Sequence, residues 1–243
     1  VSEFETIDIS SITHMRDLPV ISKGCDSSYS WSSKFKHLAF DQNEKDLAAQ
    51  INRLAEERLG CVNMHHKVTK RPIQLAFTGG EPMMQQKAMA HICEELTLQA
   101  NEMGWRIPQI TIETNGTKPR KAEFSPVRDL TDTLHFAISP KLFSVSGEKN
   151  AVNLDVIADY ANIADTCAVK FVINGTPESW KELEKYEHAL RELPVSLWVM
   201  PVGASFEDQT APTVAKIADE AMLRGYQVST RAHCYVYGNQ MGK

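Results

Sequence analysis

From Ile73 to the C-terminus, short apolar segments rich in β-branched residues alternate with longer segments of helical periodicity. The expected strands cover residues 73–77, 109–113, 134–138, 168–173, 196–200 and 227–231. The expected helices cover residues 84–103, 153–164, 177–193 and 208–224, and an earlier helix is expected over 46–59. Regular alternation of strand and helix predicts an α/β fold with a mostly parallel sheet and right-handed crossovers.

Composition narrows the class of protein. The chain has 243 residues, of which 42% are hydrophobic and 23% charged, and this composition predicts one globular domain over 1–243. Residues 1–24 are polar and irregular and are predicted to form a loop. Its five cysteines are odd in number and widely spaced, which favours a reducing cytoplasm over a disulfide framework. No apolar stretch reaches membrane-spanning length. A net charge of −5 without a basic run argues against nucleic-acid binding.

Polar residues follow several of the expected strands. Thr78-Gly79-Gly80-Glu81-Pro82 comes directly after the first, Glu113-Thr114-Asn115-Gly116 ends the second, and Ser139-Pro140-Lys141 follows the third. Because the carboxyl ends of parallel strands form the binding site in such folds, these segments are expected to converge. The two glycines let the backbone approach a ligand closely, and the glutamate suits an ammonium group. An ordinary strand-to-helix turn is the alternative.

These segments resemble the radical S-adenosylmethionine (SAM) superfamily. With Gly24-Cys25-Asp26-Ser27, Lys170-Phe171-Val172, Met200-Pro201-Val202-Gly203 and the tail from Arg231 through His233 to Gly238-Asn239, the resemblance narrows to the 7-carboxy-7-deazaguanine synthase family. It extends from about Leu18 to the C-terminus. It implies an incomplete (β/α) barrel of the radical SAM type.

The resemblance also implies roles for individual residues, although it assigns no catalytic residue. The SAM contacts are Gly79, Gly80, Glu81, Glu113, Ser139, Pro140, Lys141, Met200 and Pro201. Thr78 and His233 face the substrate. Cys25 is a ligand of a [4Fe-4S] cluster, and Ser27 is a ligand of Mg2+.

Most of these residues also have an ordinary structural interpretation. A lone cysteine such as Cys25 is often a small hydrophobic residue, and Ser27 suits a turn. Thr78 suits any strand, and Met200 suits a core. A lone histidine such as His233 is more often structural than catalytic. The pair His65-His66 and the charged helix at 177–193 are predicted to be a solvated loop and a solvated outer face.

The chain departs from the family at its start. The family takes three cluster ligands from one loop, and only Cys25 matches them; Cys61, Cys93, Cys167 and Cys234 match no cluster position. The chain begins at Val1, inside the region that resembles this loop. We therefore expect that an N-terminal piece is missing and that the sequence as printed cannot hold the cluster. A degenerate relative without a cluster is the alternative.

The activity implied is conversion of 6-carboxy-5,6,7,8-tetrahydropterin to 7-carboxy-7-deazaguanine with loss of ammonia, as in queuosine-type biosynthesis. The implied cofactors are the [4Fe-4S] cluster, SAM and Mg2+. The implied partners are a reductant protein such as flavodoxin or ferredoxin and a second copy of the chain in a homodimer. Two alternatives stay open: another radical SAM enzyme, such as a glycyl-radical activase, and a cluster-free module that binds a nucleotide or a partner.

Overall fold

The computed structural model describes residues 7–14, 17–18, 33–100 and 102–238. Its strands are β1 (Cys61–Val62), β2 (His65–His66), β3 (Leu75–Phe77), β4 (Ile107–Thr114), β5 (Thr131–Ile138), β6 (Thr166–Ile173), β7 (Ser196–Pro201) and β8 (Gln227–Val228). Its α-helices are α3 (Glu44–Leu59), α4 (Gln86–Ala100), α5 (Ser125–Asp129), α6 (Phe143–Ser146), α7 (Leu154–Ile163), α8 (Pro177–Arg191), α9 (Phe206–Thr210), α10 (Pro212–Leu223) and α11 (Ala232–Tyr237). Short 3-10 helices cover η2 (Ser33–Leu38), η3 (Pro82–Met84) and η4 (Ala122–Phe124).

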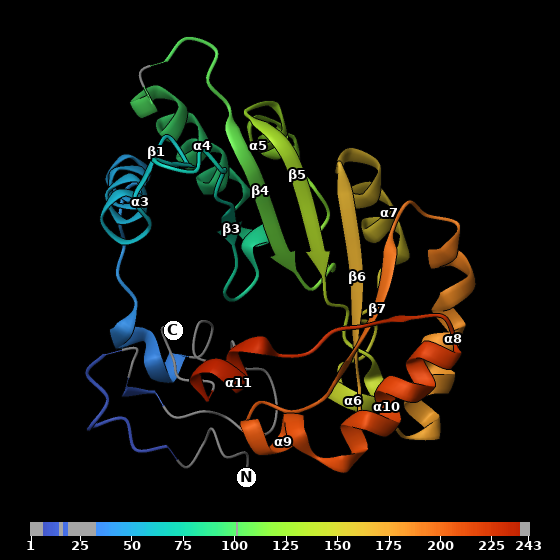
Figure 1. Cartoon of the computed structure of the whole chain (residues 1–243). Coiled ribbons are helices and arrows are strands. Elements are labelled where there is room, and N and C mark those ends of the chain that lie inside the picture. The colour runs from blue at the N-terminus through green and yellow to red at the C-terminus, as the bar shows by residue number, and fades with distance from the viewer. Residues whose placement is uncertain (1–6, 15–16, 19–32, 101, 239–243) are drawn as a thin grey trace.

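The main sheet has six strands in the sequential order β3-β4-β5-β6-β7-β8, and every neighbouring pair is parallel. Sequential order with helical crossovers is the topology of a β/α barrel, and here the sheet stays open. Figure 1 shows the curved sheet with α4, α5, α7 and α8 around its outer side, whereas α11 lies across the opening from the strands. The predicted α/β class, the mostly parallel sheet and the incomplete barrel are confirmed.

Alternation along the strands separates a helix-covered face from an open face. On the covered face, Ile110 and Ile112 of β4 and Phe136 of β5 are fully buried in the core. That core continues into α4, α7 and α8 through buried side chains such as Leu96, Tyr160 and Leu183. Because successive side chains point to opposite faces, the residues between them form the other face. We call it the inner face: Thr111 and Glu113 on β4, His135 and Ala137 on β5, Ala168 and Lys170 on β6, and Trp198 and Met200 on β7.

The described part of the polar N-terminal segment is anchored by a small second core. Ile12 and Leu18 are buried against Phe35 of η2, and Ile7 and Leu38 pack around them. Figure 1 shows this region across the opening from the strands, close to α11. Among the described residues, no helix combines the length and the apolar character that crossing a bilayer requires.

The structure corrects three predictions. The expected loop at His65-His66 is strand β2, which pairs antiparallel with β1. The expected helix at 208–224 is two helices, because Pro212 lacks an N–H and forces Ala211 into an extended conformation (φ −62°, ψ 145°). Strand β4 begins at Ile107 and therefore contains Pro108, whereas the predicted strand began after this proline. A proline, which has no N–H, is tolerated there because β3 pairs with β4 only from Ile110 onward.

Candidate functional site

The turn after β3 is built around two glycines in the left-handed region of backbone space. Gly79 has φ 79° and Gly80 has φ 54°, values that a residue with a Cβ adopts only at a cost. The turn then leads into η3, where Glu81 caps the first turn by accepting the Met83 N–H at 3.1 Å. The sequence Gly-Gly-Glu-Pro is therefore needed for the backbone path as well as for any ligand contact.

Glu81 also fastens this turn to the tip of β4. The Thr114 hydroxyl donates to Oε1 of Glu81 at 2.6 Å, and the Asn115 N–H donates to Oε2 at 2.8 Å. With the Met83 N–H, three donors of the protein reach this carboxylate. A carboxylate has roughly four acceptor positions, so its capacity for a ligand is small. Sequence reasoning placed Glu81 in the site but missed this structural role.

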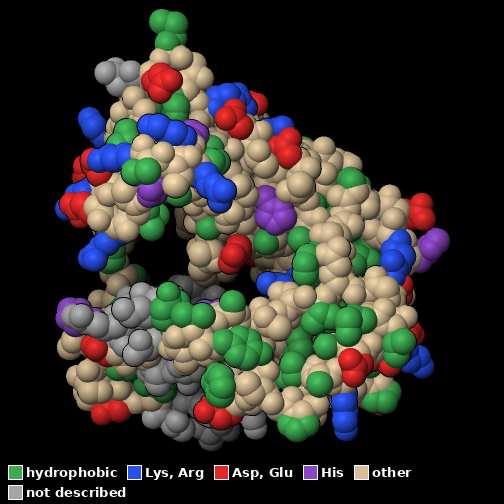
Figure 2. All heavy atoms as spheres, viewed as in Figure 1, with side chains coloured by type: hydrophobic (Ala, Val, Ile, Leu, Met, Phe, Trp, Pro, Cys, Tyr) green, Lys and Arg blue, Asp and Glu red, His purple; other side chains and the backbone are tan. Residues whose placement is uncertain are grey.

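Two further contacts join the strand tips. The Thr78 hydroxyl donates to Oε2 of Glu113 at 2.8 Å, between exposed side chains on adjacent strands. The Ser139 N–H donates to the carbonyl oxygen of Thr114 at 2.8 Å, which ties the segment after β5 to β4. The structure therefore brings together the tips of β3, β4 and β5, as the sequence predicted. Figure 2 shows the molecule hollowed here, with acidic, basic and histidine side chains at the edge of the hollow.

His135 lies on the inner face and was missed by the sequence analysis. Its Nδ1 lies 2.8 Å from the Thr166 hydroxyl oxygen, and its register partner on β4 is Thr111. Burial lowers the pKa of His135 below 6.5, while Thr166 and the charge of Glu113 oppose that shift. Only the alternation along β5 could have indicated this position, because the face of a strand is set by its register.

Other predicted residues lie apart from the strand tips. Lys141 lines a cavity of about 260 Å3 together with Glu182 and Tyr186 of α8. His233 is exposed on α11, a helix that packs on α9. Met200 is buried on β7. None of the hydrogen bonds recorded among the described residues links these side chains to the turn at Gly79.

The described cysteines do not form a metal centre. Cys61, Cys93, Cys167 and Cys234 are all buried and unpaired by disulfides. Burial raises the pKa of Cys93 and of Cys167 to about 12, which keeps both thiols protonated at neutral pH. Within the described residues, no group of three histidine, cysteine or carboxylate side chains could hold a metal ion. Cys25 and Ser27, the predicted iron and Mg2+ ligands, lie outside the described residues.

Comparison with curated proteins supplies the deciding observation. The chain is 25% identical over 219 residues to a 7-carboxy-7-deazaguanine synthase of Pyrobaculum aerophilum, an alignment that covers 90% of this chain and 82% of that protein. The chain is similar in sequence to the 7-carboxy-7-deazaguanine synthases. The protein of that name from Methanospirillum hungatei is 31% identical over 116 residues, which cover 48% of this chain and 41% of the relative. This relatedness confirms the resemblance that the strand-end motifs predict. No protein-family model matches the chain.

Solved structures with a partial likeness include two of SuiB from Streptococcus suis, one of them bound to S-adenosylmethionine. The SAM-bound structure matches with a TM-score of 0.49 and 15% identity, and the other with 0.48 and 15%. The match to the SAM-bound structure covers 79% of this chain and 44% of SuiB, so the chain spans less than half the length of that protein.

Proposed function

We propose that the protein is a 7-carboxy-7-deazaguanine synthase, a radical SAM lyase that converts 6-carboxy-5,6,7,8-tetrahydropterin to 7-carboxy-7-deazaguanine with release of ammonia. The observation that carries this proposal is the hydrogen bonding between the strand tips. In particular, the hydrogen bond between Thr114 and Glu81 joins the Gly-Gly-Glu-Pro turn to β4. The relatedness over 90% of the chain supports the same reading. The proposal places the enzyme in the cytoplasm as a homodimer that receives electrons from a flavodoxin or ferredoxin.

The residues after β3 fit S-adenosylmethionine, because a built Cβ on Gly79 meets nothing within 4 Å and the backbone there is open to a ligand. In the proposal, Gly79, Gly80 and Glu81 hold its methionine end. Ser139 and Glu113 lie on the neighbouring strand tips and contact the rest of it. SAM would supply the radical that removes a hydrogen atom from the substrate. The protein's own contribution is to position both molecules and to exclude water.

The inner face fits a flat heterocycle that carries N–H donors. Glu113 offers an exposed carboxylate whose Oε2 is oriented by Thr78. In the register of the sheet, Glu113 is followed by Ala137 and then by Ala168, and both side chains are small. A planar ring such as the adenine of SAM can lie over such a row while its exocyclic N–H groups donate to Glu113. Met200 and His233 stay proposed contacts of SAM and of the substrate.

The described residues do not fit the cluster, because their cysteines are buried and form no set of three ligands. We therefore derive no step through iron, and none through Mg2+. A second candidate function, left open by the sequence, is a cluster-free module that binds SAM or another nucleotide. The two functions predict the same strand-tip site and differ in turnover.

Two measurements test the proposal and separate it from the second candidate. Calorimetry should detect SAM binding that the substitution Gly80→Val weakens. Anaerobic turnover of the native gene product with reductant, SAM, Mg2+ and 6-carboxytetrahydropterin should then yield 7-carboxy-7-deazaguanine by mass spectrometry. SAM cleavage without pterin conversion would leave a radical SAM enzyme of another kind, such as an activase. SAM binding without cleavage would favour the module, and absence of binding would remove both.

A further inference from the structure

One row of side chains on the inner face is polar where a packed barrel would be apolar. The register of the sheet places Ala76 of β3, Thr111 of β4, His135 of β5 and Thr166 of β6 side by side. The interior of a closed β/α barrel is normally filled by bulky apolar side chains. We call Thr111, His135 and Thr166 the polar row. Their chemistry suits contact with a ligand better than contact with a packed core.

The main observation is the hydroxyl of Thr111. The residue is only 3% exposed, and its Oγ1 has no hydrogen-bond partner among the described residues. A buried polar group without a partner is destabilising, and most buried hydroxyls therefore have one. Thr111 lies on the inner face, because Ile110 and Ile112 on either side of it point into the helix-covered core. A ligand in the hollow of that face (Figure 2) would supply the missing partner.

His135 presents a second hydrogen-bonding group beside Thr111. Neighbouring strands lie about 4.8 Å apart, so the side chains of these register partners are adjacent. Burial lowers the pKa of His135 below 6.5, and the ring is therefore neutral at pH 7. Its Nδ1 lies 2.8 Å from Oγ1 of Thr166, which opposes the shift as an acceptor of a ring N–H does. With the proton on Nδ1, Nε2 carries a lone pair and accepts a hydrogen bond.

The polar row lies deeper in the inner face than the proposed SAM contact Glu113. Glu113 is two residues closer to the strand tip than Thr111, which is roughly 6.6 Å along β4. Because the proposed function assigns Glu113 to SAM, the polar row is available to the second ligand, the pterin. A donor hydroxyl beside an acceptor nitrogen fits a lactam edge, where a carbonyl oxygen lies next to a ring N–H.

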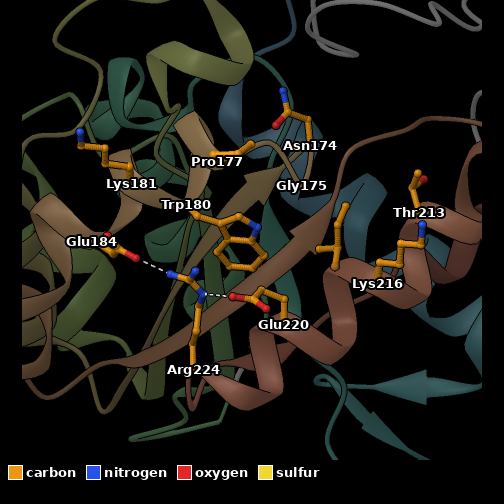
Figure 3. A pocket seen from close by; sticks show the side chains of 11 residues that line it. Asn174, Gly175, Pro177, Trp180, Lys181, Glu184, Thr213, Lys216, Glu220 and Arg224 are labelled. Atoms are coloured by element: carbon orange, nitrogen blue, oxygen red, sulfur yellow. Dashed lines mark hydrogen bonds and ion pairs between the residues drawn. The ribbon is translucent and has the colours of Figure 1, made fainter.

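The cavity among the outer helices lacks such a feature. It lies between α8 and α10, has a volume of about 590 Å3 and is lined in part by Trp180 and Arg224 (Figure 3). Arg224 lies over the Trp180 ring, 4.8 Å from its centroid, and donates to Glu220 and Glu184. Within the described residues, no side chain that lines this cavity has a buried nitrogen or oxygen without a partner. The unsatisfied hydroxyl therefore distinguishes the inner face from this cavity.

We propose that Thr111 and His135 bind the lactam edge of the pterin substrate. The Thr111 hydroxyl donates to the ring carbonyl oxygen, and Nε2 of His135 accepts the adjacent ring N–H. This inference rests on the proposed synthase function and adds two substrate contacts to it. The two contacts together select a heterocycle that has a carbonyl beside a ring N–H, which the adenine of SAM lacks.

The test measures binding of 6-carboxypterin, a stable pterin with the same lactam edge, and of SAM to the native gene product by calorimetry. Thr111→Val and His135→Leu should each weaken 6-carboxypterin binding by at least about fivefold and change the Kd of SAM by less than about twofold. Thr133→Val is the matched control, because Thr133 lies on the same face of β5 two residues further from the strand tip. It should change both Kd values by less than about twofold.

A second measurement separates a ligand contact from a structural role. Thr111→Val removes a buried hydroxyl that has no partner among the described residues. Its midpoint of urea denaturation without ligand should therefore stay the same or rise, although it binds the pterin less tightly. A lower midpoint would show that the hydroxyl is bonded within the fold and would overturn the proposal.

The outcomes separate this inference from the proposed function. If both variants bind 6-carboxypterin as the unmodified protein does, the two contacts are wrong and the synthase proposal stands. Weaker SAM binding with unchanged 6-carboxypterin binding would place SAM on the polar row and would also overturn the inference. An unmodified protein that fails to bind 6-carboxypterin would refute the proposed substrate together with these contacts, whatever its affinity for SAM.

Discussion

The hydroxyl of Thr114 donates to the carboxylate of Glu81 over 2.6 Å and thereby joins the end of β4 to the turn that follows β3. The same hydroxyl oxygen accepts the Gly116 N–H at 3.1 Å. Thr114 is only 5% exposed, so this contact lies in a region of low dielectric where hydrogen bonds to a charged group are strong. The glycine turn is thus positioned by β4 as much as by its own sequence.

Removing this hydroxyl should therefore loosen the turn. Thr114→Val keeps the shape of the side chain but leaves Glu81 with one donor fewer, and it should lower the free energy of unfolding by about 1.5–3 kcal/mol. Thr117→Val is the matched control, since the Thr117 hydroxyl donates to Asn115 and not to Glu81. We expect about 0.5–1.5 kcal/mol for the control. Urea denaturation measures both, and equal losses would contradict the special role of the Glu81 contact.

Much of the fold could be predicted because its pattern is local. Each strand of the main sheet carries alternating or continuous apolar residues, and the helices between them have the usual end signals, such as Pro177 at the start of α8. The hairpin of β1 and β2 was missed for a specific reason. Its turn uses Asn63 (φ 45°) and Met64 (φ 57°), and the second of these is not the glycine that normally signals such a turn. Burial of Met64 in the core compensates for the strained backbone.

The strand tips of the candidate site could also be predicted, since the carboxyl ends of parallel strands meet at one edge. Contacts that depend on register or on side-chain direction could not. His135 faces the inner side only because of the pairing of β5 with β4, and Lys141 turns toward α8 although it follows a strand tip. The individual ligand roles of these residues stay predictions. Cys25 and Ser27 lie outside the described residues, so their roles as iron and Mg2+ ligands also stay predictions.

The glycine turn offers a direct test of the SAM proposal. Gly80→Val should weaken SAM binding by at least about tenfold, because a branched side chain at φ 54° both strains the turn and crowds a ligand that approaches the backbone. Gly104→Ala is the control, since Gly104 (φ 76°) lies before β4, at the opposite end from the strand tips, and its added Cβ meets nothing within 4 Å. Backbone strain of about 1–2 kcal/mol should lower its stability. Calorimetry with SAM distinguishes the two variants. An unchanged SAM affinity in a folded Gly80→Val protein would refute the proposed role of this turn in SAM binding.

The 243-residue polypeptide should bind iron poorly in anaerobic reconstitution. The reason is that its four described cysteines are buried, and the raised pKa values of Cys93 and Cys167 disfavour the thiolate that iron requires. Iron and sulfide analysis should find well below the roughly four irons per chain of an intact cluster. A near-stoichiometric content with the absorption of a [4Fe-4S] cluster would show that the ligand set has been misjudged.

His135 should make the fold less stable as the pH falls below neutrality. Burial lowers its folded pKa below the ordinary value of 6.5, so the unfolded chain binds the proton more readily than the native state does. The contribution of the neutral imidazole is present above pH 6.5 and is lost as the pH falls from 6.5 through the folded pKa. NMR titration of the His135 ring protons should give a midpoint below 6.5. His135→Gln should flatten the pH dependence of the free energy of unfolding in that window. A midpoint at or above 6.5, or a pH profile of His135→Gln identical to that of the unmodified protein, would show that His135 is not held neutral on the inner face.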